Sequence, residues 1–142
     1  MMSSWIFWAF LSAIFAALTT IFAKIGIQSI DSDLATLIRT AIVFLLLALF
    51  IQLSGKWANP FSISRNTWLF LSLSGIATGA SWLCFYRALQ IGDASKVLVI
   101  DKFSIVMVAI LAFIFLGEKP IMKDWLGILL VASGLILIAI KR

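Results

Sequence analysis

Two oppositely charged residues, Asp101 and Lys102, stand side by side within an apolar run that covers residues 97–116. Carboxylate and ammonium groups bind ions, exchange protons or hold charged ligands, so chemistry is expected first at this pair. In a membrane-spanning helix an Asp or Lys costs about 2.5 to 3.5 kcal/mol, whereas each Val, Leu, Ile or Phe returns about 0.3 to 0.6 kcal/mol. The two charges therefore roughly cancel the apolar gain, and the segment needs partners.

The composition places these residues in an integral membrane protein. Of the 142 residues, 63% are hydrophobic and 12% are charged, whereas soluble domains have about 25% charged residues. A membrane-spanning helix needs about 20 apolar residues, and five stretches of roughly this length cover residues 5–23, 34–53, 68–89, 95–116 and 125–140. We therefore predict an all-α fold: a bundle of five transmembrane helices in a single domain over residues 1–142, with the lipid bilayer as a partner.

The connections between these spans carry the chemistry of helix boundaries. Asp33, Asn66 and Asp93 precede the second, third and fourth spans, and each is a candidate N-cap. Pro60 breaks any helix in the longest loop, and Pro120 lies between the fourth and fifth spans. The last two spans are therefore expected to form a tight hairpin.

Depth counting brings a third charge, Arg39, to the level of the pair. If odd spans run from the N-terminal side (side A) to the opposite side (side B), the second and fourth spans both begin at side B. Arg39, Asp101 and Lys102 then lie roughly 8 to 10 Å below that surface. Adjacent residues on a helix point about 100° apart, so Asp101 and Lys102 are not expected to face each other. Arg39 is the better partner for Asp101, because a planar guanidinium suits a bidentate bond to a carboxylate.

Two interpretations of this layer stay open. In the structural one, Arg39 and Asp101 form a satisfied ion pair between two helices, and Lys102 extends to the membrane surface. In the functional one, Asp101 binds a cation or exchanges a proton, while Arg39 and Lys102 tune it or bind an anionic group. The single net positive charge of the layer favours an anionic or zwitterionic ligand.

Aromatic and small residues add candidates in the third and fifth spans. Trp82 is a further candidate for ligand binding, because its ring offers a π face within the side B half of the third span, although an interfacial anchor is the alternative role. Tyr86, one turn further along, is interpreted as an interfacial anchor. Close helix packing is predicted at the small residues Gly75, Gly79, Gly127 and Gly134, which have GxxxG or heptad spacing.

The positive charges give no clear membrane orientation. Four basic residues fall on side A and five on side B: Lys56, Arg65, Lys119 and Lys123 against Lys24, Arg87, Lys96, Lys141 and Arg142. One explanation is that other features set a single orientation. The other is that the chain inserts in both orientations and pairs as an antiparallel homodimer, which would recreate the inverted repeats of secondary transporters.

Several function classes are disfavoured by what the sequence lacks. It has no histidine and a single cysteine, Cys84, so disulfides, zinc clusters and histidine-based catalysis are not expected. No spacing of nucleophile and base indicates an enzyme, and no cofactor or metal is predicted. The net charge of +5 is spread over helix ends rather than gathered in a patch, so nucleic acid is not expected as a partner.

Several motifs resemble the EamA domain of the drug/metabolite transporter superfamily, in particular its short bacterial members with one domain. They are Leu37-Ile38-Arg39, Tyr86-Arg87-Ala88-Leu89, Gly92-Asp93-Ala94-Ser95, Ile100-Asp101-Lys102, Leu116-Gly117-Glu118-Lys119 and Trp125-Leu126-Gly127 with Gly134. The resemblance implies five helices per domain, two inverted domains per transporter and a small-metabolite substrate. A chain with one such domain is then expected to form a homodimer, in the bacterial cytoplasmic (inner) membrane.

The resemblance does not specify the coupling ion or the partner chain. The related small multidrug resistance proteins use a glutamate in their first helix, whereas the first span here, residues 5–23, has no charge. Proton coupling of that type is therefore not carried over. The alternative function is a non-transporting subunit, for example a helix-packing partner or one half of a heteromeric flippase for lipid-linked sugars.

Overall fold

The helices begin and end at local signals that the sequence carries. A computed structural model describes residues 4–140, and within this range it contains helices and no strand. The α-helices are α1 (Ser4–Gly26), α2 (Ser32–Leu53), α3 (Arg65–Ile91), α4 (Ala94–Asp101), α5 (Ser104–Leu111) and α6 (Met122–Ala139). Two short 3₁₀ turns, η1 (Ile27–Ser29) and η2 (Pro60–Ser62), and a π-helical turn, η3 (Ala112–Leu116), complete them.

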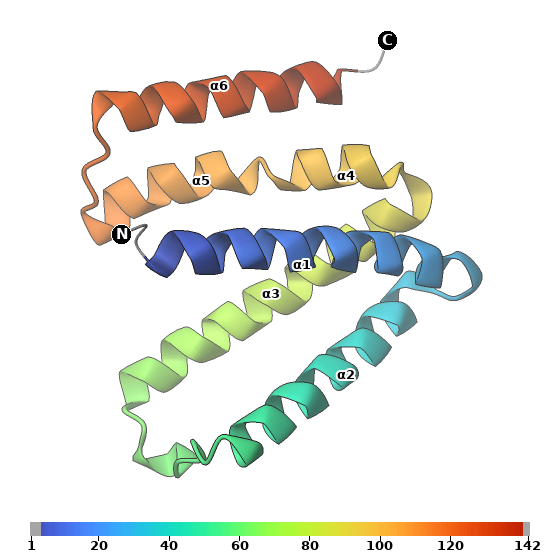
Figure 1. Cartoon of the computed structure of the whole chain (residues 1–142), viewed down its shortest axis with the longest axis vertical. Coiled ribbons are helices and arrows are strands. Elements are labelled where there is room, and N and C mark those ends of the chain that lie inside the picture. The colour runs from blue at the N-terminus through green and yellow to red at the C-terminus, as the bar shows by residue number, and fades with distance from the viewer. Residues whose placement is uncertain (1–3, 141–142) are drawn as a thin grey trace. The chain divides into compact units, whose positions relative to one another are not determined.

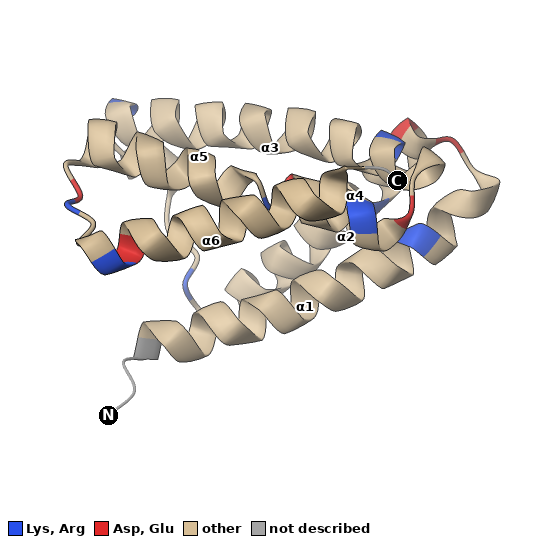
Figure 2. Ribbon diagram, turned by 90° about the horizontal axis from the view of Figure 1, so that it is seen from above, with Lys and Arg blue, Asp and Glu red and all other residues tan. Residues whose placement is uncertain are grey.

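Five segments are long and apolar enough to cross a membrane, which confirms the predicted all-α membrane fold and the number of spans. They are Trp5–Ser29, Ser32–Leu53, Arg65–Ile91, Ala94–Leu116 and Met122–Ala139. Charged residues lie mostly in loops and at helix ends (Figure 2). Lys141 and Arg142, which belong to the sequence count for side B, lie outside the described residues.

The helix caps correct two details of the prediction. Asp31, not Asp33, caps α2: its carboxylate accepts the backbone N–H groups of Asp33 and Leu34 at 2.9 and 3.2 Å. Ser64, not Asn66, precedes α3, and its hydroxyl oxygen accepts the N–H of Thr67 at 3.2 Å. In both cases the capping residue lies two positions before the predicted one, which leaves Asp33 free to contact another helix.

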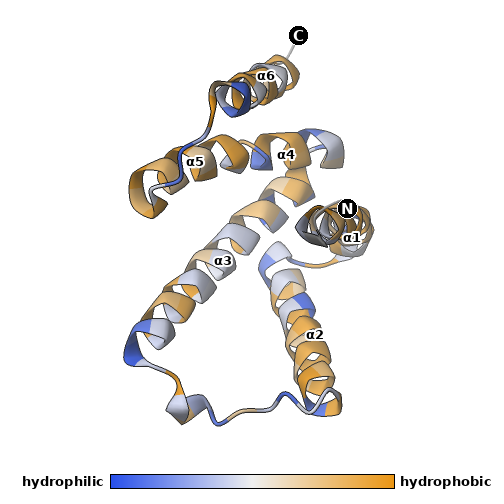
Figure 3. Ribbon diagram, turned by 60° about the vertical axis from the view of Figure 1, so that its left-hand side comes forward, coloured by the Kyte–Doolittle hydropathy of each residue, from blue (hydrophilic) through white to orange (hydrophobic). Residues whose placement is uncertain are grey.

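The helices form two compact units along the chain, and each is described by itself. The first unit ends at Ile91 and contains α1, α2 and α3. Within it, α2 and α3 pack together where α2 begins and α3 ends, and they diverge toward the loop between them (Figures 1 and 3). The last turns of α1 and η1 contact the same end of α3.

The buried residues of the first unit gather at this end, which we call the junction. Its members are Thr20, Ile27, Ser32, Thr36, Tyr86 and Leu89, none of them more than 5% exposed. Three are small and hydroxylic, and Thr20 and Thr36 donate their hydroxyl groups to backbone carbonyls one turn earlier. This composition suits a membrane protein, where close packing and internal hydrogen bonds replace the hydrophobic effect.

The second unit begins at Gly92 and contains α4, α5, η3 and α6. Helix α6 packs along both α4 and α5, as the predicted hairpin requires. The turn between them begins at Gly117, which has a left-handed φ of 65° that glycine adopts without strain. The N–H groups of Gly117 and Glu118 both donate to the Ala112 carbonyl, which closes the π-helical turn.

Candidate functional site

The fourth span is interrupted where its two charges stand, which the sequence analysis did not predict. A continuous helix was expected over residues 95–116, but α4 ends at Asp101 and α5 begins at Ser104 (Figure 1). Around the break the backbone bonds shorten to a three-residue period: Phe103 N–H donates to Ile100, and Ile105 N–H donates to Lys102. Neither Gly nor Pro lies at this position, so the break coincides with the charged pair alone.

The break also changes the relation between Asp101 and Lys102. The expectation that adjacency keeps the two side chains apart was wrong, because Lys102 Nζ lies 3.5 Å from Asp101 Oδ2. That expectation assumed regular helical angles, whereas Lys102 lies in the turn between two helices and its long side chain folds back. Both side chains stay accessible, at 45% for Lys102 and 37% for Asp101. The two side chains therefore compensate each other's charge, and neither is buried.

Apolar residues border the break within the same unit. Ile100 and Phe103, on either side of the charged pair, line an open pocket against α6 together with Leu135, Ile136 and Ala139. All five lining residues are apolar, so the pocket suits the apolar part of a solute, a lipid chain or another helix.

In the first unit, Arg39 stacks on aromatic rings. Its guanidinium carbon lies 4.3 Å from the centroid of the Trp82 ring and 5.8 Å from that of Tyr86. Both rings come from α3, so α2 and α3 position the site jointly. Cation–π contacts of this kind contribute about 0.5 to 2 kcal/mol. We call Trp82 and Tyr86 the aromatic platform.

The sequence analysis assigned roles to both rings of the aromatic platform, and the structure affects the two roles differently. Tyr86 is not an exposed interfacial anchor, because it is 4% exposed and packs in the junction. Trp82 is half-buried and contacts Arg39, one of the predicted site residues. The spacing of four residues did place both rings on one face of a helix, but only the tertiary pairing of α2 with α3 brings Arg39 over that face.

The predicted ion pair between Arg39 and Asp101 stays a prediction. The two residues belong to different compact units, so the layer of three charges rests on depth counting alone. Within its own unit each residue has a neighbour that the sequence analysis did not assign: the aromatic platform for Arg39, and Lys102 for Asp101.

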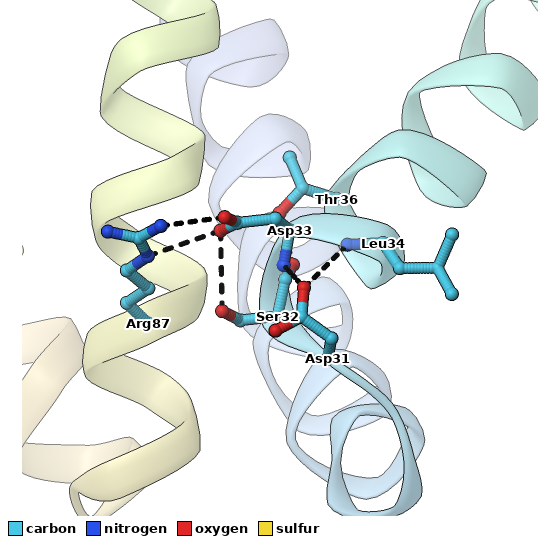
Figure 4. Close-up of polar contacts among 6 residues, drawn as sticks. All are labelled: Asp31, Ser32, Asp33, Leu34, Thr36 and Arg87. Atoms are coloured by element: carbon cyan, nitrogen blue, oxygen red, sulfur yellow. Dashed lines mark hydrogen bonds and ion pairs between the residues drawn. The ribbon is translucent and has the colours of Figure 1, made fainter.

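A bidentate ion pair between helices of the first unit involves residues that were not predicted as a pair. Arg87 on α3 donates two hydrogen bonds to the carboxylate of Asp33 on α2 (Figure 4). The distances are 3.2 Å from Nε to Oδ1 and 2.6 Å from a terminal guanidinium nitrogen to Oδ2. The signal in the sequence was opposite charge at two helix ends of the same membrane side. Side-chain exposures of 68% for Arg87 and 42% for Asp33 indicate a solvated contact.

Two further side chains close the junction by binding backbone oxygens. Lys24 at the end of α1 donates from Nζ to the carbonyl of Leu89 at 2.7 Å. Gln90 donates from its amide nitrogen to the carbonyl of Ile30 at 2.9 Å. The Leu89 carbonyl is among the last four of α3, which lack partners within the helix, and a cation there also suits the helix dipole. The basic residues Lys24 and Arg87 thus lie at the same end of the unit, as the assignment of both to side B predicted.

The four glycines predicted to pack helices have open faces. A Cβ built on Gly75, Gly79, Gly127 or Gly134 would meet nothing within 4 Å. The helix-packing role of these residues therefore stays a prediction, and no helix of the same unit contacts these faces. Within residues 4–140, no group of three Cys, Asp or Glu side chains is arranged to hold a metal ion.

An α-helical chain with five membrane spans, one of them interrupted at a charged pair, has the architecture of a membrane transport protein. The chain belongs to the EamA-like transporter family, whose model its residues 3–140 match. The match covers both compact units. The chain is therefore a multi-pass membrane protein of a transporter family.

Similar proteins carry transporter names. A Sinorhizobium protein named "Uncharacterized transporter in cobO 3'region" is 54% identical over 140 residues, which are 99% of each chain. "Uncharacterized transporter YxxF" of Bacillus subtilis is 29% identical over 143 residues, which are 100% of this chain and 44% of the relative. The chain therefore spans less than half the length of YxxF.

A third relative is named as a flippase subunit. It is the "Probable 4-amino-4-deoxy-L-arabinose-phosphoundecaprenol flippase subunit ArnE" of Yersinia pestis. The two chains are 29% identical over 89 residues, which are 62% of this chain and 78% of the relative. No solved structure matches the chain.

Proposed function

We propose that the chain is a secondary transporter of a small metabolite that works as a homodimer, by alternating access, in a bacterial cytoplasmic membrane. One observation carries the proposal: the fourth span of a chain in a transporter family is interrupted at Asp101 and Lys102. Secondary transporters form their substrate and ion sites at interrupted membrane helices, where backbone and charged groups line a cavity. Charged residues inside a membrane span are candidates for such a site.

The pair can exchange its internal contact for a contact with a solute. Lys102 and Asp101 approach to 3.5 Å, longer than the 2.7 to 2.9 Å typical of a charge-assisted hydrogen bond, and both are accessible. A charged group of the substrate replaces one member of the pair as the partner of the other. The cost of separating two charges in the membrane is then offset by the new contact, so that binding and release both stay possible.

Three observations support a homodimer. Among the described residues, few are buried within the chain, and most large apolar side chains of the spans are exposed. Helix α3 has the lowest mean hydropathy of the five spans, and polar and apolar residues alternate along it (Figure 3). None of the residues in its most apolar window is buried. Since lipid is a poor solvent for such a polar surface, a second protein chain is the better cover.

The antiparallel arrangement is supported by charge balance. The four basic residues of side A and the five of side B give neither orientation an advantage. YxxF has more than twice the length of this chain, which leaves room for a second unit of similar size. Two copies of this chain in opposite orientations supply the same number of spans. Labels at each terminus, tested for access from both membrane faces, separate this arrangement from a single orientation.

The second candidate function is a subunit of a heteromeric lipid-linked-sugar flippase or another non-transporting membrane subunit. The likeness to a protein named as flippase subunit ArnE supports it. It requires a different partner chain, and it predicts no transport by the purified protein alone. The homodimeric carrier, by contrast, is active after purification.

The deciding experiment is transport by the purified chain in liposomes, screened over small metabolites, with Asp101→Asn as the test variant. We expect this variant to fold and dimerise but to lose at least about tenfold in uptake, because the pair loses its carboxylate charge. Glu118→Gln is the matched control, since it removes an exposed carboxylate of the turn after η3. Unchanged uptake by Asp101→Asn, or a variant that fails to fold, would favour a structural ion pair instead.

Mixing active and inactive chains extends the same experiment to the homodimer. Equal amounts of wild-type and Asp101→Asn chains leave about a quarter of the dimers fully wild-type if partners mix randomly. Uptake below one half of the wild-type rate indicates that both copies contribute. Uptake equal to one half indicates independent chains.

A further inference from the structure

Arg39 is a cation inside the membrane span that has no anionic partner in its own unit. Among residues 4–140 the ion pairs join Arg87 with Asp33, Lys96 with Asp93 and Lys102 with Asp101, and none includes Arg39. No hydrogen bond from its guanidinium is present in this part of the chain either. The two carboxylates at the start of α2 are engaged elsewhere, since Asp33 binds Arg87 and Asp31 caps the helix.

The aromatic platform holds Arg39 without using its hydrogen-bonding capacity. A guanidinium stacks through its flat face, whereas its five N–H donors point outward in the plane of the group. The guanidinium carbon lies over the Trp82 ring, 4.3 Å from its centroid, and within residues 4–140 no hydrogen bond occupies the donors. Such donors match the two oxygens of a carboxylate or phosphate, which a guanidinium binds bidentately.

The depth of Arg39 makes an unfilled site costly. It lies seven residues beyond Ser32, the first residue of α2, and so about 10 Å along the helix axis from that end. An arginine inside a membrane span carries an insertion cost, and a cation–π contact offsets only part of it. A second partner with negative charge closes that gap.

We propose that Arg39, oriented by the aromatic platform, binds the carboxylate or phosphate oxygens of the transported solute, and that the substrate is therefore anionic or carries an oxyanion. This inference rests on the proposed transport function, whose substrate class it specifies. The flat Trp82 ring next to the guanidinium gives an apolar surface for the rest of the solute.

Binding to the full-length chain in nanodiscs tests the proposal independently of transport. The probes are benzoate and inorganic phosphate as oxyanions, with tetramethylammonium and glucose as controls of opposite and zero charge. Equilibrium dialysis with radiolabelled probe measures binding. Tryptophan fluorescence, compared between the wild type and Trp82→Phe, reports whether the probe reaches the platform.

We expect saturable binding of at least one oxyanion, and no comparable binding of tetramethylammonium or glucose. Arg39→Gln should weaken oxyanion binding at least about tenfold, and Arg39→Lys should weaken it less because it keeps the charge but not the bidentate geometry. Arg65→Gln, which removes an exposed arginine at the start of α3, should leave binding unchanged. Binding that persists in Arg39→Gln, or a preference for tetramethylammonium, would overturn the proposal.

The lipid composition of the nanodiscs identifies the source of the oxyanion. Equal affinity for benzoate in phosphatidylcholine discs and in discs with added phosphatidylglycerol assigns the site to a solute. Competition by phosphatidylglycerol assigns the site to a lipid headgroup phosphate. That result would overturn the claim that the ligand is a transported solute, and Arg39 would still be an oxyanion-binding residue.

A double variant separates oxyanion binding from an internal ion pair. If Arg39 serves only to neutralise Asp101, Arg39→Gln alone should be unstable, and adding Asp101→Asn should restore folding with no oxyanion binding at any stage. That result would contradict the proposal. Oxyanion binding without measurable transport of any solute would instead leave this inference standing and refute the transport function.

Discussion

The two arginines between α2 and α3 differ in what surrounds them. Arg87, at the junction, meets the carboxylate of Asp33 through two nitrogens. Arg39, deeper in the span, lies over the rings of the aromatic platform and forms no ion pair within residues 4–140. At the junction the guanidinium of Arg87 thus has a carboxylate partner, whereas on the aromatic platform the N–H donors of Arg39 have none within residues 4–140. The first arrangement joins helices, and the second suits a group that must bind and release a ligand.

The largest expected effect comes from giving Arg39 a carboxylate partner of the kind that Arg87 has in Asp33. Trp82→Glu places a carboxylate next to Arg39, where it forms an internal ion pair like that of Arg87. We expect oxyanion binding and transport to fall at least about tenfold while the protein stays folded, because the guanidinium is then occupied. Dialysis and liposome uptake measure the loss. Trp82→Gln is the control of the same size without charge, and equal losses in the two variants would show that the ring alone matters.

A smaller effect is expected on stability at the junction. Lys24→Met removes the hydrogen bond from Nζ to the Leu89 carbonyl and the cation at the end of α3. The expected cost is about 1 kcal/mol in the free energy of unfolding, measured by denaturant titration in mixed micelles. Lys56→Met, in the exposed loop after α2, should cost nothing. Equal stability of the two variants would mean that the junction does not depend on this contact.

The smallest effect is expected from the solvated ion pair itself. Asp33→Asn and Arg87→Gln should each lower the melting temperature slightly, and the double variant should be no worse than either single one. About 1 M salt should remove the difference, because the screening length then falls to about 3 Å. Transport should be unaffected by either substitution. A large loss of transport in Asp33→Asn would give the junction a role beyond joining helices.

The sequence predicted the fold well because hydropathy is strong in a membrane protein. Long apolar stretches with few charges define spans directly, and all five are present in the structure. Helix boundaries were less certain, since Asp31, Ser32 and Asp33 are all good N-caps and only the backbone geometry selects Asp31. The break after Asp101 escaped prediction because no Gly or Pro marks it.

The sequence analysis named the residues of the candidate site but did not predict which side chains they contact. Charges inside apolar stretches drew attention to Arg39, Asp101 and Lys102. Their neighbours depend on which helix faces which, and on side chains that leave regular helical directions at a break. The stacking of Arg39 on Trp82 needs the α2 and α3 pairing, which periodicity within one helix does not specify.

The interruptions of the fourth span have a mechanical consequence. Helix α5 is eight residues long, or about 12 Å, and irregular backbone bounds it at both ends: the turn at Lys102 and Phe103, and the π-helical turn of η3. Irregular turns of this kind are the points at which a helix bends most readily. Helix α5 therefore joins the charged pair at one end to the turn at Gly117 at the other as one short, regular segment.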